Sequence, residues 1–188
     1  MPILPKDRDP RLITLRRGGT LTDDDHHLLA AWALGCAEHV LPLFEEHREE
    51  EFEEHRPEEL EEHRPADRRP RHAIELGYAW IRGEVSMGVA HQAAFQANAA
   101  GKGMPDPAKF AALSAGQAVA VAHVAAHDLG AAAYAIRAAG ASVPADDAGL
   151  ARARERDWQR DQLPAAVRDL VLDDQRQRSA ICWNVFDD

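Results

Sequence analysis

The chain has 188 residues, of which 45% are hydrophobic and 29% are charged, a composition typical of one globular domain. Its formal net charge is −10, and the region 44–65 contributes −8 of this through eleven Glu and three Arg. The rest of the sequence is nearly neutral and has no concentrated basic face, which argues against a nucleic-acid-binding protein.

The chain begins with a segment, 1–20, in which three prolines oppose a helix, so we expect an extended arm. This arm contains no apolar core of a signal sequence. The two cysteines, Cys36 and Cys182, lie in apolar surroundings, where buried, reduced thiols are more typical than a disulfide. Together these features predict a cytoplasmic protein.

Thr22, followed by three aspartates, predicts the start of the first helix, and Pro42 should kink or end it. Three tandem copies then fill 44–65 with the sequences FEEHREEE, FEEHRPEE and LEEHRP. A period of eight residues rotates a helix by about 80° per copy, so the apolar residue of each copy drifts off any common face. We interpret this octad tract as a solvated low-complexity insertion whose histidines do not converge on a metal ion.

Apolar spacing and capping residues predict four further helices. No stretch of useful length alternates between apolar and polar residues as a β-strand does. The expected ranges are 68–82, 86–100, 145–162 and 164–185. In the third of these helices, Leu150 and Trp158 are the expected anchors to the core. The fold class is therefore all-α, a single-domain multi-helix bundle that spans residues 1–188.

The predicted centre of this bundle is one long Ala-rich helix over about 106–140, with Asp106 as its N-cap and Gly140 as its stop. It is apolar nearly all round, as expected of a buried helix. Its polar residues argue against a membrane span. Gly116 and Gly130 each cost about 1 kcal/mol in a helix interior relative to Ala, which makes sense if a neighbouring helix crosses close to the backbone there.

His123 and His127 are four residues apart, the spacing that lets two imidazoles on one helical face share a metal ion. The zinc protease pattern also needs Glu directly after the first His, but that position holds Val124. Asp128 would point about 100° away from His127 on a helix. Packed, hydrogen-bonded histidines are therefore the favoured interpretation, and we predict no metal, no cofactor and no catalytic residue.

The last predicted helix has two charged residues on its apolar face. Asp174 and Arg178 are four apart, with the acid first, which is the favourable order for an intrahelical ion pair. A structural, partly buried pair is the favoured interpretation, and a polar pocket or a partner contact is the alternative.

Four separated stretches resemble a known family in their order along the chain. They are DPRLITLRRGGTLTDDDH, HAIELGYAWIRGEVSM, AGQAVAVAHVAAHDLGAAAYAI and LVLDDQRQRSAICWNVF. Together they resemble the putative immunity proteins of bacterial, largely actinobacterial, polymorphic toxin systems. In that family a short connection usually replaces residues 45–66, so the octad tract resembles an insertion.

The resemblance implies a small helical cytoplasmic protein that binds and neutralises a cognate toxin, and it defines no catalytic residues. A stoichiometric inhibitor needs a complementary surface, and Trp, Tyr and Arg dominate such surfaces energetically. The candidate contact residues are Trp80, Arg152, Arg156 and Trp158. The alternatives are a metal-dependent helical enzyme that uses His123 and His127, and a helical ligand-binding or regulatory module. Homodimer formation stays open.

Overall fold

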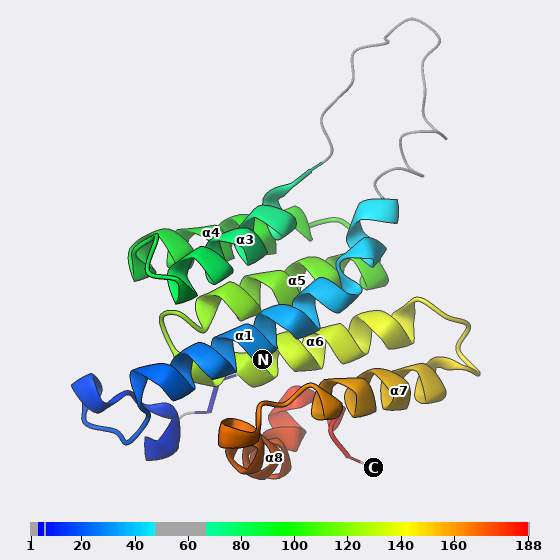
Figure 1. Ribbon diagram of the computed structural model, residues 1–188. Coiled ribbons are helices and arrows are strands. Elements are labelled where there is room, and N and C mark those ends of the chain that lie inside the picture. The colour runs from blue at the N-terminus through cyan, green and yellow to red at the C-terminus, as the bar shows by residue number, and fades with distance from the viewer. Residues whose placement is uncertain (1–3, 6, 48–66, 188) are drawn as a thin grey trace, which may run out of the picture.

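The computed structural model describes residues 4–5, 7–47 and 67–187, and these residues form an all-α bundle, as predicted (Figure 1). The described part contains no β-strand, only one isolated bridge between Thr14 and Leu21. The helices are α1 (Asp23–Val40), α3 (Arg69–Ile81), α4 (Met87–Ala100), α5 (Asp106–Ala120), α6 (Asp128–Ala141), α7 (Ala148–Asp161) and α8 (Ala165–Arg178).

Local sequence signals set most of the helix ends. The Thr22 hydroxyl caps α1 by accepting from the backbone N–H of Asp25 at 3.0 Å, and the Ser86 hydroxyl caps α4 in the same way. Pro42 interrupts the first helix, which turns at Leu41 and then continues to residue 47. One expected cap differs, because Asp106 is the first residue of α5 and Pro105 precedes it.

The prediction of one central helix over 106–140 is wrong. The helix stops at Ala120, a turn follows, Val124 is extended, and a short 3-10 helix (Ala125–His127) leads into α6. A continuous 35-residue helix would be about 52 Å long, more than a domain of this size can enclose. The apolar run folds back on itself instead, so α5 and α6 form a buried helical hairpin.

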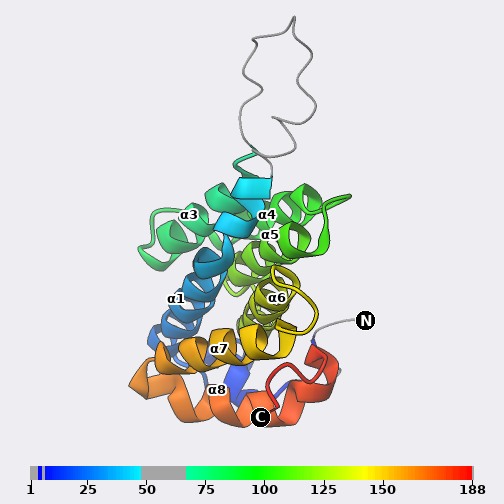
Figure 2. The same cartoon turned by 90° about the vertical axis from the view of Figure 1, so that its right-hand side faces the viewer.

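This hairpin is the centre of the molecule, and α1 packs against both of its helices. The pair α3 and α4 forms one end of the bundle, with α4 lying on α5, whereas α7 and α8 form the opposite end, with α7 lying on α6 (Figures 1 and 2). The buried residues of α5 and α6 are mostly alanines, whose small side chains let neighbouring backbones approach closely.

Gly116 and Gly130 mark close approaches between helices, as the sequence suggested. A Cβ atom added to Gly116 would lie 2.2 Å from Asn98 Oδ1 and 3.1 Å from the carbonyl oxygen of Ala94, both on α4. A Cβ atom on Gly130 would lie 2.6 Å from Gln117 Oε1 on α5. Helix packing therefore explains both glycines.

The helical region Asp23–His47, which consists of α1 and its continuation after Pro42, has the length and hydropathy of a membrane span. More than half of its most apolar 18-residue window is buried in the bundle, with Leu29, Leu34 and Phe44 fully enclosed. This is the pattern of a core helix. Residues 48–65 of the octad tract lie outside the described residues.

The two chain ends depart from the expected regular segments. Residues Pro10–Leu12 and Leu15–Arg17 form short 3-10 helices within the arm predicted to be extended. The last predicted helix ends at Arg178 and not near 185, because a 3-10 turn follows and Trp183 then adopts positive φ. These tight turns fold the C-terminal residues back, and Phe186 becomes buried.

The expected anchors of α7 need correction. Leu150 is 54% exposed and Trp158 is half-buried, whereas the residues that α7 buries are Glu155 and Gln159. The helix is so highly charged that its inner face is polar, and hydrogen bonds attach it to the bundle in place of apolar contacts.

Candidate functional site

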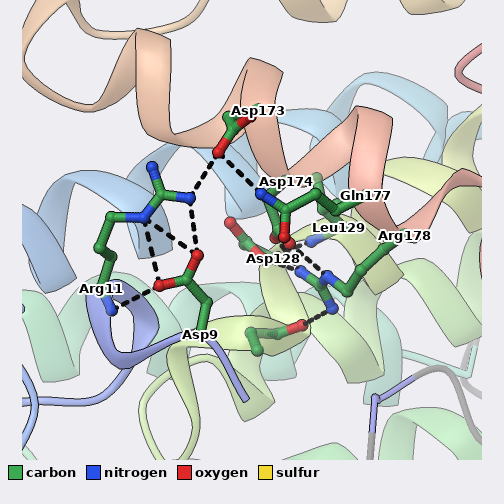
Figure 3. A network of polar contacts seen from close by, with 9 residues as sticks. Asp9, Arg11, Asp128, Leu129, Asp173, Asp174, Gln177 and Arg178 are labelled. Atoms are coloured by element: carbon green, nitrogen blue, oxygen red, sulfur yellow. Dashed lines mark hydrogen bonds and ion pairs between the residues drawn. The ribbon is translucent and has the colours of Figure 1, made fainter. Parts of the chain in front are cut away.

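A buried ionic triad joins α8 to the start of α6 (Figure 3). Arg178 donates from Nε to Asp174 Oδ1 at 2.7 Å and from Nη2 to Asp128 Oδ1 at 3.2 Å. Its Nη1 atom donates to the carbonyl oxygen of Ala126 at 2.8 Å. The three charged side chains are at most 5% exposed. The Asp174–Arg178 pair expected from spacing is therefore part of a triad in which one cation serves two carboxylates.

Burial dominates the electrostatics of this triad. It raises the pKa of Asp128 to about 7 and also raises the pKa of Asp174, while Arg178 opposes both shifts. Asp128 Oδ1 also accepts from the backbone N–H of Leu129, but Oδ2 has no hydrogen-bond partner among the described residues. Because the triad is enclosed, it holds α8 against the α5–α6 turn and offers no contact surface to a partner.

A second, exposed network ties the N-terminal arm to the outer face of α8 (Figure 3). Arg11 pairs with Asp9 on its own segment and with Asp173 on α8. Asp173 also accepts from the side-chain amide of Gln177 at 2.8 Å. The Arg11 guanidinium lowers the pKa of both carboxyl groups. This network attaches the arm to α8, next to the buried triad.

The structure does not place His123 and His127 on one helical face. Both lie in the segment between α5 and α6, where the ring of His123 stacks on that of His91 at a centroid distance of 4.5 Å. His127 Nδ1 donates to Gln117 Oε1 at 2.7 Å. Burial lowers the pKa of both histidines, that of His127 to about 4.

These contacts favour packed, neutral imidazoles. Across residues 4–5, 7–47 and 67–187, no group of three or more His, Cys, Asp or Glu is arranged to hold a metal ion. Burial also raises the pKa of the two thiols, Cys36 and Cys182, which disfavours the reactive thiolate form. Among the described residues, no third side chain of this kind therefore joins His123 and His127 as a metal ligand.

An open hollow lies on the surface between α1 and α7, and Trp158 is at its edge. The residues that line it are Ala31, Trp32, Gly35, Glu38, His39, Trp158, Gln162 and Pro164. The ring of Trp158 stacks on that of His39 at a centroid distance of 3.7 Å. No described atom lies within 4 Å of the position of a Cβ added to Gly35, as is also the case for Gly149 on α7. Internal packing therefore does not explain Gly35.

A buried polar network fixes the wall of this hollow. Glu155 accepts from His39 Nδ1 at 2.8 Å and from the side-chain amide of Gln159 at 2.8 Å. The same Gln159 amide donates to the carbonyl oxygen of Ala132 on α6, and its own backbone carbonyl accepts from Trp32 Nε1 at 2.8 Å. These bonds join α1, α6 and α7, and they hold Trp158 and His39 in a fixed stacked arrangement.

The other three candidate contact residues are more engaged in the fold. Trp80 on α3 is half-buried and packs edge-on against the rings of His26 and His27. The stem of Arg152 lies over Gly140, where an added Cβ would meet its Cγ at 2.6 Å. Arg156 donates to the backbone carbonyl oxygen of Asp187, near the C-terminus. Trp158 is thus the candidate that combines a fixed aromatic ring with an adjacent hollow.

Sequence reasoning missed Asp128, Glu155 and Gln159. Asp128 was discounted because a continuous helix would turn it away, although a lone carboxylate within a 30-residue apolar run is itself a signal of a buried ion pair. Glu155 and Gln159 are four residues apart and look like surface residues of a charged helix. Their burial depends on α6, which no local pattern in α7 can reveal.

The comparison with known families gives a match for most of the bundle. The model described as "Imm-5 like putative immunity protein" matches residues 19–56 and 51–166. The chain belongs to this family. The two matched stretches meet within the octad tract, and they include α1 and α7, which form the hollow. Helix α8, with Asp174 and Arg178, lies beyond the matched residues.

The comparisons with curated proteins and with solved structures gave no match.

Proposed function

We propose that this protein is a non-catalytic immunity protein that neutralises a cognate toxin of a bacterial polymorphic toxin system by binding it in the cytoplasm. The observation that carries the proposal is the family match, which spans α1 to α7. Two structural features support a binding role over a catalytic one. The triad of Asp128, Asp174 and Arg178 is enclosed in the bundle, and His123 and His127 are held by packing partners.

We further propose the α1–α7 hollow as the toxin-binding site. Trp158 offers a large ring beside the hollow, and Trp is among the residues that contribute most to binding energy. Its stacking on His39 restrains the ring before binding, which lowers the entropic cost of association. The open floor at Gly35 would allow a backbone or a bulky side chain of the toxin to approach α1 closely.

The first experiment tests the function. Products of genes adjacent to this one are expressed in bacteria with and without this protein, and growth and direct binding are measured. We expect one product to be toxic alone, to be rescued by co-expression, and to form a complex of defined stoichiometry. If no neighbouring product is toxic, or if a toxic one is neither bound nor rescued, the proposed function is wrong.

The second experiment tests the site with two matched glycine substitutions. Gly35→Arg places a long side chain in the hollow, whereas Gly149→Arg places the same side chain on α7, at a position where no described atom lies within 4 Å of the added Cβ. We expect Gly35→Arg to weaken toxin binding at least 30-fold and Gly149→Arg to leave it within about threefold. If both variants rescue growth as the wild type does, the toxin binds another surface, and the proposed immunity function still stands.

A further inference from the structure

The hollow between α1 and α7 carries a carboxylate that no cation neutralises. Glu38 is exposed and lines the hollow, and it forms no ion pair with any Lys or Arg in the described part of the chain. The hydroxyl of Tyr78 on α3 donates to Glu38 Oε2 at 3.2 Å, and burial together with the charge of Glu38 raises the pKa of Tyr78 to about 12. The phenol therefore stays a donor that orients the carboxylate, while Oε1 has no partner among the described residues.

The rest of the lining supplies no positive charge to Glu38. Of the described residues that line the hollow, none is Lys or Arg. The other titratable residue there, His39, is bound through Nδ1 to Glu155 at 2.8 Å, so Glu155 balances any proton on His39. Arg71 on α3 interacts electrostatically with Glu38, but it already pairs with both oxygens of Glu45 at 2.6 Å. The hollow therefore has a net negative charge.

This charge restricts what can cover the hollow. A partner seated there removes water from Glu38, and burying an ionised carboxylate without a cation is strongly unfavourable because nothing replaces its hydration. The apolar part of the lining, which includes Ala31, Trp32 and Pro164, keeps the covered site poor in water and so strengthens a charge pair formed in it. A partner that fills the hollow must therefore bring a positive charge to Glu38.

We infer, on the basis of the toxin-binding site proposed above, that the toxin inserts an arginine side chain into this hollow and pairs it with Glu38. A guanidinium is planar, binds a carboxylate through two N–H groups and stacks on aromatic rings, whereas the ammonium of lysine is a compact, strongly hydrated charge. The stacked rings of His39 and Trp158 line the same hollow and provide aromatic surface for such a cation. The hollow has a volume of about 430 Å³, within the range of pockets that hold small ligands, so a whole side chain fits.

Substitutions of Glu38 test this inference with the toxin identified by the first experiment. Glu38→Gln keeps an oxygen for the Tyr78 hydroxyl but removes the charge, and Glu38→Arg reverses it. We expect Glu38→Gln to weaken toxin binding about 30-fold or more in isothermal titration calorimetry, and Glu38→Arg to weaken it further. Glu46→Gln is the matched control, since Glu46 is exposed on the continuation of α1 outside the hollow and should change binding by less than about threefold. Circular dichroism verifies that each variant is folded.

A charge exchange identifies the toxin residue that meets Glu38. Each arginine of the toxin is changed in turn to glutamate, and each product is measured against the wild type and against Glu38→Arg. We expect one exchanged arginine to bind Glu38→Arg about tenfold or more tightly than it binds the wild type, because the pair is restored with its charges reversed. A purely structural role of Glu38 would weaken binding without such a specific recovery.

Two results would overturn this inference and leave the proposed function intact. In the first, Gly35→Arg blocks toxin binding but both Glu38 variants bind as the wild type does, so the toxin fills the hollow without a cation. In the second, the Glu38 variants bind weakly, but no arginine of the toxin shows recovery with Glu38→Arg. If Gly35→Arg also binds normally, the toxin contacts another surface, and the site and its arginine are both wrong. If no neighbouring gene product is toxic and rescued, the proposed function fails and this inference fails with it.

Discussion

Helices α4 and α7 are each 14 residues long and cover opposite ends of the same α5–α6 hairpin, but they do so by different means. Helix α4 has no Asp, Glu, Lys or Arg and buries only alanines, whereas α7 has seven such residues and buries Glu155 and Gln159. On the α4 side, stability depends on close, non-directional packing. On the α7–α8 side, it depends on hydrogen bonds and ion pairs whose loss leaves charges buried.

The comparison predicts that the most damaging single substitution lies on the polar side. Arg178→Met leaves Asp128 and Asp174 buried without their cation, which should lower the free energy of unfolding by about 3–5 kcal/mol in urea denaturation. Arg176→Met, on the exposed face of α8, should change it by less than about 0.5 kcal/mol.

A triple variant sharpens this test. Asp128→Asn and Asp174→Asn, combined with Arg178→Met, remove the uncompensated charges and should restore much of the lost stability. A triple variant as unstable as Arg178→Met alone would mean that packing volume, and not charge, decides stability on this side.

On the small-residue side, the largest expected effect is at the closest helix contact. Gly116→Ala would place Cβ 2.2 Å from Asn98 Oδ1 and 3.1 Å from the Ala94 carbonyl oxygen, so α4 must shift outward. We expect a loss of about 1–3 kcal/mol in the free energy of unfolding. Stability equal to wild type would show that α4 packs more loosely than its contacts suggest.

The turn between α5 and α6 should make stability depend on pH. His127 is largely buried and its pKa is lowered from 6.5 to about 4, so the unfolded chain binds its proton first as the pH falls. Stability from this group is present above pH 6.5 and is lost as the pH falls toward 4. Since the side chain is partly exposed, we expect wild type to lose about 1 kcal/mol more than His127→Gln between pH 7 and pH 5, by urea denaturation. Parallel curves for wild type and His127→Gln would contradict the shifted pKa of His127.

The smallest expected effect is a gain in stability. Gly35 in α1 has no described atom within 4 Å of an added Cβ, so Gly35→Ala should stabilise the protein by about 0.5–1 kcal/mol through higher helix propensity. Thermal unfolding of Gly35→Ala and Gly116→Ala side by side gives opposite signs for the same chemical change. Destabilisation by Gly35→Ala would mean that α1 is packed where the structure shows open space.

Much of the fold could be predicted because its signals are local. Thr22 and Ser86 cap helices, Pro42 interrupts one, and the glycines in the Ala-rich run indicated close crossings. The expected pair Asp174–Arg178 follows from spacing within one helix. Local signals could not predict the break between α5 and α6 at 121–127, because alanine favours a helix throughout this run. Only the limited size of the domain makes the run fold back.

The sequence by itself determined that this chain is helical, where most helices begin and end, and to which family it belongs, because backbone propensity and capping act over a few residues. Only the tertiary structure decided that Asp128 meets Arg178, that Glu155 and Gln159 are buried, and that α4 exposes an uncharged face. These outcomes depend on contacts between residues 27 to 127 positions apart, whose partners are set by how the helices pack around the α5–α6 hairpin.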